Sequence, residues 1–141
     1  MSLDHLHPML VHFPISLVIF GFLADIAVII YKKELWLSKA GFYLLITGTI
    51  AALFTLLSGA LFTSEMSGEA GEVRETHELL AWITVILLVI ASVFQVLMNM
   101  RKTDSKNLRF ISLCLYGLGA LAVGFTGFYG GTLVYNYMMP L

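Results

Sequence analysis

The sequence predicts an all-α protein of the membrane, an up-and-down bundle of four transmembrane helices with both termini on the outer side. Two observations carry this prediction. The 141-residue chain is 59% hydrophobic and only 12% charged, whereas a soluble domain carries about twice that charged fraction. Its lysines and arginines are also concentrated in two of the segments that connect the apolar stretches.

Four apolar stretches are each long enough to cross a bilayer as a helix. A hydrocarbon core requires about 20 residues at a rise of about 1.5 Å each. Lipid offers no partners for open backbone groups, which favours helices, and the alternation of a barrel strand is absent. We expect a single domain over residues 1–141, with spans at about 10–31, 41–63, 79–98 and 110–137.

The first span begins with two prolines and two of the four histidines. Pro8 suits a first helical turn, where its missing N–H costs nothing. Pro14 removes an intrahelical hydrogen bond and biases Phe13 away from helical angles. We therefore expect a break that frees backbone carbonyls and turns His12 towards the bundle axis. Residues 1–5 contain no basic side chain, so we do not expect this span to be a cleaved signal peptide.

The second and fourth spans carry stripes of small residues at intervals of seven. Such stripes let helix backbones approach closely in lipid, which is the interpretation we favour, and they can also clear room for a flat cofactor. The stripes consist of Gly41, Gly48 and Thr55, and of Gly117, Gly124 and Gly131.

The third span follows a polar connection at residues 64–78, which holds five glutamates and one basic residue, Arg74. The other seven basic residues lie between spans one and two or between spans three and four. Because cytoplasmic loops are enriched in lysine and arginine, both of those connections are expected in the cytoplasm. The termini and the acidic connection then face the periplasm or the cell exterior.

All four histidines fall at the predicted outer end of this bundle. The first and third spans both enter from that side, so His12 and His77 are expected at similar depth. On diagonal helices they would face each other across a core about 12–14 Å wide. Polar groups at membrane depth tend to be functional, which makes this end the candidate site.

Three interpretations of the histidine site stay open. In the first, His12 and His77 are the axial ligands of haem b, and Arg74 pairs with a propionate. In the second, the protein binds copper or zinc. In the third, no cofactor is bound, and the imidazoles are hydrogen-bonded within a structural or assembly subunit. The ligands of the second interpretation would come from His5, His7, His12 and His77, with Asp4 as a further oxygen donor.

Asp25 is an acidic residue inside the first span, about 9 Å from its inner edge at helical rise. It is either a hydrogen-bonded carboxyl that fixes helix packing or a proton-relay carboxylate. No second acid lies within the other three spans, so a proton pump is not favoured. Side chains at matching depth on the other helices are Tyr43, Thr47, Gln95 and Tyr116.

Several function classes lack support in the sequence. The net charge of −1 and the absence of a phosphate-binding glycine loop give no case for nucleic acid. The single Cys114 forms neither a disulfide framework nor a CxxC pair, and we expect it to be a small buried side chain. No nucleophile–base constellation is present, so an enzyme is not the favoured class.

The motifs resemble those of a bacterial membrane-domain family, number 2231 among the domains of unknown function. Residues 7–15 match its HPxxVHFPI opening, and residues 130–135 match its GGxLVY ending. Ser58-Gly59 and the Arg74-x-x-His77 pair continue the likeness across the chain. The resemblance implies a small four-helix protein of the bacterial inner membrane. It also implies a redox setting, because relatives are attached to cytochrome c-like domains.

These observations predict an inner-membrane protein with a periplasm-facing histidine site. We expect the site to bind haem b and to serve electron transfer or to anchor a redox partner; the alternatives are a copper- or zinc-binding protein and a cofactor-free subunit. The chain has no CxxCH, so it carries no c-type haem of its own. The expected partners are the lipid bilayer, a cytochrome c-like or other membrane redox protein, and further copies of the chain as a homo-oligomer.

Overall fold

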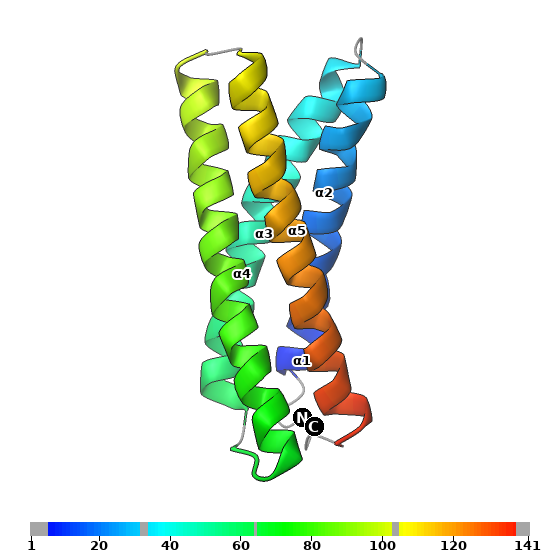
Figure 1. Ribbon diagram of the computed structural model, residues 1–141, viewed down its shortest axis with the longest axis vertical. Helices are drawn as coiled ribbons and strands as arrows, with labels where there is room; N and C mark the ends of the chain where they lie inside the picture. The colour runs from blue at the N-terminus through cyan, green and yellow to red at the C-terminus, as the bar shows by residue number, and fades with distance from the viewer. Residues whose placement is uncertain (1–5, 32–33, 64, 103–104, 138–141) are drawn as a thin grey trace.

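The computed structural model describes residues 6–31, 34–63, 65–102 and 105–137, and these residues are almost entirely α-helical with no strand among them (Figure 1). Four helical stretches are long and apolar enough to cross a membrane, which confirms the predicted all-α bundle of four membrane helices. The helices are α1 (Leu6–Leu10), α2 (His12–Ile30), α3 (Leu35–Phe62), α4 (Glu69–Met100) and α5 (Lys106–Tyr135).

The four long helices form a closed ring in which each packs on its two neighbours. Helix α2 packs on α3, α3 on α4, α4 on α5, and α5 on α2, so that α2 and α4 are diagonal. The short α1 lies at the start of α2 and packs against α3. The N-terminal start of α1 and the C-terminal end of α5 therefore lie at the same end of the bundle (Figure 1).

Large apolar side chains cover the outside of the bundle. Leu61 is 72% exposed and Phe128 is 69% exposed, and similar residues lie along every long helix. A surface of this kind suits lipid rather than water. Cys114 is also exposed, which corrects the expectation that it is buried. A span that is apolar all round does not reveal which of its faces points inward, so hydropathy could not place this side chain.

The core between the helices is narrow and depends on small residues. An ideal Cβ at Gly48 would lie 2.8 Å from Cγ2 of Val18, so glycine is what lets α3 approach α2. No atom lies within 4 Å of such a Cβ at Gly124 or Gly131. Close packing thus explains Gly48 but neither of these two α5 glycines. The largest fully buried side chains are Tyr116, Leu45, Leu88, Leu133 and Val18.

Two helices extend well beyond the apolar stretches from which they were predicted. Helix α3 begins at Leu35, and α4 begins at Glu69, within the polar segment 64–78 that was expected as a connection. Hydropathy marks only the part of a helix that lipid surrounds. Glutamate, alanine and arginine are good helix formers, and Glu69 and Glu72 in the first turn of α4 complement the helix dipole.

The irregularity near Pro14 is smaller than the expected break. Val11 separates α1 from α2, but it keeps helical angles and its N–H still bonds the carbonyl of His7 at 3.1 Å. Because Pro14 has no N–H, it cannot donate to the carbonyl of Leu10, four residues earlier. The hydroxyl of Thr55 on α3 reaches that carbonyl at 3.3 Å and also donates to Ala51 of its own helix at 2.9 Å. This hydrogen bond ties the first span to α3. It also satisfies the carbonyl that Pro14 leaves free, because lipid offers such a group no partner.

Candidate functional site

Two imidazoles from diagonal helices meet at the end of the bundle that holds the start of α1. The ring centres of His7 on α1 and His77 on α4 lie 6.3 Å apart, and their planes are inclined at 79°. Both side chains are partly buried and line one cavity. The pairing of two imidazoles across the core was predicted, but the residue from the first span is His7.

His7 is oriented by the Ser58-Gly59 pair of α3. Its Nδ1 lies 2.9 Å from Oγ of Ser58, and Ser58 donates its own hydrogen to the carbonyl of Thr55 at 2.7 Å. Since that hydroxyl hydrogen is already used, Ser58 accepts from an Nδ1–H of His7. An ideal Cβ on Gly59 would lie 3.0 Å from Cε1 of the ring, so the imidazole rests directly on the glycine.

His77 is held by α5 in the same manner. Its Nδ1 lies 3.0 Å from the backbone carbonyl of Thr126. A carbonyl only accepts, so Nδ1 carries the hydrogen here too. Gly130 provides the flat surface beneath the ring, since a Cβ there would lie 3.0 Å from Cε1 of His77. The Thr126 hydroxyl adds a bond of 2.8 Å to Thr84, which fixes α5 against α4 at this level.

These bonds determine which ring nitrogens remain for a ligand. In a neutral imidazole with hydrogen on Nδ1, the Nε2 lone pair is the free acceptor. In this neutral form His7 and His77 would each keep an Nε2 lone pair. Two such nitrogens beside one cavity suit a metal centre.

His12 does not take the inward position that was predicted for it. Its side chain is exposed, and Nδ1 donates to the carbonyl of Pro8 at 2.9 Å. His7 and His12 are five residues apart, about 140° around a helix, so turning one of them inward turns the other away. His12 still lines the edge of the cavity. The expectation that the break would aim it at the bundle axis is wrong.

The described residues contain no group of three or more histidine, cysteine, aspartate or glutamate side chains placed to hold one metal ion. His5 and Asp4, which the copper or zinc interpretation included, lie outside the described residues. Within the described part of the chain, the donor set at this site is therefore the pair of imidazoles.

The cavity beside the histidines has a volume of about 340 Å³ and is mainly apolar. Ligand pockets typically measure about 300–1,000 Å³. Helices α1 to α5 all contribute to its walls, and Gly131 leaves part of the α5 wall open. Its apolar lining includes Val11, Ile15, Ala52, Leu56, Val85 and Val123.

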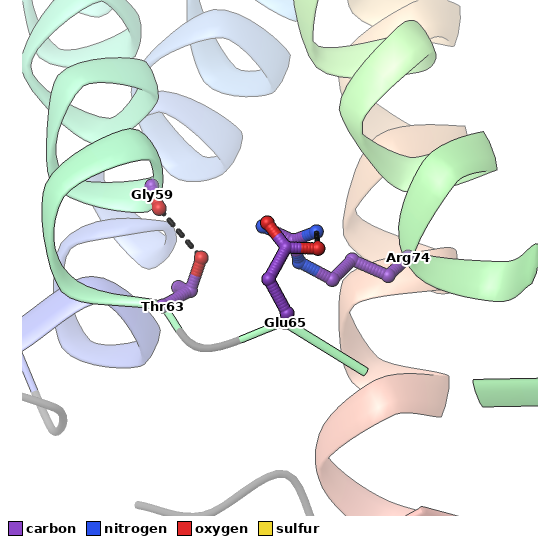
Figure 2. A network of polar contacts seen from close by, with 4 residues as sticks. All are labelled: Gly59, Thr63, Glu65 and Arg74. Carbon is purple, nitrogen blue, oxygen red and sulfur yellow. Dashed lines mark hydrogen bonds and ion pairs between the residues drawn. The ribbon is translucent and has the colours of Figure 1, made fainter. Parts of the chain in front are cut away.

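Arg74 lines the same cavity and is the cationic group of the site. Its Nη1 lies 3.0 Å from Oε2 of Glu65, and Figure 2 shows the two side chains meeting near the end of α3. The Arg74 side chain is only 19% exposed, whereas that of Glu65 is 91% exposed. A surface carboxylate of this kind contributes little, so another anion can replace it at the guanidinium. Thr63 beside them bonds the carbonyl of Gly59 (Figure 2).

The residues that orient the two imidazole rings could not be recognised as such from the sequence. Ser58-Gly59 and Gly130 were noted only as parts of family motifs. Their residue types fit the role, because a hydroxyl can bond an imidazole and a glycine leaves room for its ring. Thr126 contributes its backbone carbonyl, and no residue type signals that role. These contacts depend on the register between helices, which one sequence does not specify.

Asp25 lies near the opposite end, where it meets Gln95 of α4. The Gln95 amide donates to Oδ2 of Asp25 at 3.1 Å, which confirms one of the four expected partners. The other carboxylate oxygen lies against the backbone at Gly41. Thr47 instead bonds carbonyls of its own helix, and Tyr116 donates to the Gly41 carbonyl at 3.4 Å.

Comparisons with known proteins give one match. A family model described as "predicted membrane protein (DUF2231)" matches residues 4–140. No curated protein and no solved structure matches the chain.

Proposed function

The chain belongs to the DUF2231 family of predicted membrane proteins, and we propose that it binds haem b between His7 and His77 and transfers electrons through it. The observation that carries the proposal is the facing pair of imidazoles, 6.3 Å apart between ring centres, with both Nδ1 atoms engaged by neighbouring helices.

The spacing of the two rings supports a metal between them. An imidazole nitrogen binds a first-row metal at about 2.0–2.1 Å and lies about 1.1 Å from its ring centre, so two rings on one metal are about 5–6.5 Å apart. The observed 6.3 Å falls within this range, near its linear limit. The hydrogen bonds from Nδ1 are those that metal-ligating histidines ordinarily make.

The size of the donor set favours haem over a bare ion. Zinc and copper sites usually take three or four protein ligands, and the described residues offer no such group. Haem supplies the other four donors itself, so two axial imidazoles complete the coordination of its iron. The glycine-lined apolar cavity and the guanidinium of Arg74 suit a macrocycle and its propionate.

Two axial histidines also favour electron transfer over catalysis. If His7 and His77 held the haem from both sides, no coordination position would remain for oxygen or a substrate. The chain's own residues would hold the ring orientations and exclude water, while the cofactor would supply the one-electron chemistry. We further propose that the site faces the periplasm and exchanges electrons with a separate cytochrome c-like protein, since seven of the eight basic residues belong to the connections at the other end.

The visible spectrum of the purified protein tests this proposal. We expect a Soret band with sharp reduced α and β bands from the wild-type chain, and their loss in His7→Ala and in His77→Ala. His12→Ala is the matched control, because His12 is exposed and bonded to Pro8, and it should keep the haem.

Three other results would contradict the proposal. Unchanged haem in His77→Ala would remove that residue as a ligand. Stoichiometric copper or zinc in a colourless protein would favour the bare-metal interpretation. A folded protein that binds neither haem nor metal, even after reconstitution, would leave a structural or assembly role.

A further inference from the structure

A second and larger cavity, of about 850 Å³, lies at the end of the bundle opposite the histidines. It is bounded by residues of α2, α3, α4 and α5 and by the segment between the last two. Figure 1 shows the α2–α3 hairpin and the α4–α5 hairpin diverging towards this end. The cavity therefore lies between the two hairpins, with residues of both in its lining.

Cationic side chains surround this cavity. Lys39 of α3, Lys102 after α4, and Lys106 and Arg109 of α5 all line it. Among its described lining residues only Asp25 carries a carboxyl, and that group is bonded to Gln95 within the helical span. The described lining therefore offers the lysines no other carboxylate, and an external anion can approach them at the rim.

Ser112 of α5 adds a hydroxyl group to the same cavity. The residue is 7% exposed and lines the cavity. Helical hydroxyls elsewhere in this protein, such as those of Thr126 and Thr132, donate to a carbonyl four residues earlier. The Ser112 hydroxyl can instead bond a polar group that enters the cavity from outside.

The remaining walls are apolar and open to the surface. Ile29 and Phe110 line the cavity and are exposed on the outside of the bundle, where lipid chains would lie. A ligand for this site thus has an anionic oxygen-rich head for the lysines and Ser112, joined to apolar chains for these walls. Basic pockets between transmembrane helices recognise lipid head groups in this way.

We propose that this cavity, defined by Lys39, Lys102, Lys106 and Ser112, is a binding site for one anionic phospholipid through its phosphodiester head group. The proposal is independent of haem binding, because none of these residues lines the histidine cavity. By the positive-inside tendency, this lipid belongs to the cytoplasmic leaflet. The bound lipid bridges the two hairpins where they separate.

Titration of the purified full chain in detergent tests the site, with native mass spectrometry and thermal unfolding as readouts. We expect one phosphatidylglycerol to bind and to raise the unfolding temperature, and neither phosphatidylcholine nor inorganic phosphate to do so. Each lysine-to-glutamine change should weaken binding about fivefold, and Lys39→Gln/Lys102→Gln/Lys106→Gln about 100-fold.

Arg101→Gln is the matched control, because it removes a positive charge at the same end from a residue that does not line the cavity. We expect it to leave phosphatidylglycerol binding within twofold of wild type. A loss equal to that of Lys102→Gln would overturn the site in favour of diffuse attraction to the basic surface. Retained binding in the triple variant, or equal binding of inorganic phosphate alone, would also overturn it.

Discussion

His7 and His77 are separated by 70 positions in the sequence, yet their ring centres lie 6.3 Å apart across the diagonal of the bundle. Each ring is fixed by a different neighbour, Ser58 on α3 or the Thr126 carbonyl on α5. Residues of α1, α3, α4 and α5 are thus required to build this one pair of imidazoles.

Ser58→Ala should weaken haem binding without unfolding the bundle. The change removes the acceptor that holds the His7 ring, and loss of such an outer partner typically costs about 10–100-fold in metal affinity. Haem release to a scavenging apoprotein measures this affinity. Thr132→Ala is the control, because Thr132 bonds only its own helix; an equal loss there would remove Ser58 from the site.

Gly59→Ala and Gly130→Ala should both displace an imidazole. The added methyl group would lie 3.0 Å from Cε1 of the ring in each case, so the ring or the helix must shift. We expect a reduced haem content at unchanged helical content by circular dichroism. Gly124→Ala, where no atom lies within 4 Å, should keep its haem. Normal haem spectra in both Gly59→Ala and Gly130→Ala would contradict the proposal that these glycines position the two rings.

Asp25 and Gln95 should be coupled in stability. Removing either partner leaves a buried polar group unsatisfied, at a cost of about 1–3 kcal/mol, whereas replacing both by apolar residues is often nearly neutral. We therefore expect Asp25→Leu/Gln95→Leu to unfold closer to wild type than Gln95→Leu alone. Denaturation in detergent measures this, and strictly additive effects would exclude a structural pairing of these two side chains.

Thr55 and Pro14 should also be coupled. Thr55→Val removes the hydroxyl that reaches the carbonyl of Leu10, and we expect a loss of about 1 kcal/mol. Pro14→Ala restores an N–H that can bond this carbonyl within the helix. In the Pro14→Ala background, Thr55→Val should therefore lower the free energy of unfolding by less than it does in the wild type. An undiminished cost would mean that the hydroxyl matters only for its own helix.

Membrane orientation can be measured with single cysteines in a Cys114→Ser background. Glu72 and Lys106 are both exposed and lie at opposite ends of the bundle. We expect an impermeant maleimide to label Glu72→Cys in intact cells and Lys106→Cys only after permeabilisation, since the basic connections should face the cytoplasm. The reverse pattern would place the histidine site inside the cell.

The number of helices and their membrane character followed from the sequence alone. Hydropathy and length are local properties, so the four spans required no knowledge of packing. The clustering of His7, His12, Arg74 and His77 at one end was also predictable, because chain direction alternates from span to span. Pro14 likewise signalled the missing helical hydrogen bond to Leu10, because proline has no N–H wherever it lies.

Only the tertiary structure decided which histidine enters the core. The rotation of α1 about its axis depends on the irregularity at Val11 and on the contacts of the His7 ring with Ser58 and Gly59. The spacing of His7 and His12 in the sequence encodes neither. The Ser112 hydroxyl and the lysines share a cavity for the same reason, because the angle between the hairpins sums many weak packing contacts. One sequence therefore placed the chemistry at an end of the bundle, and packing between helices selected the side chains that face each other.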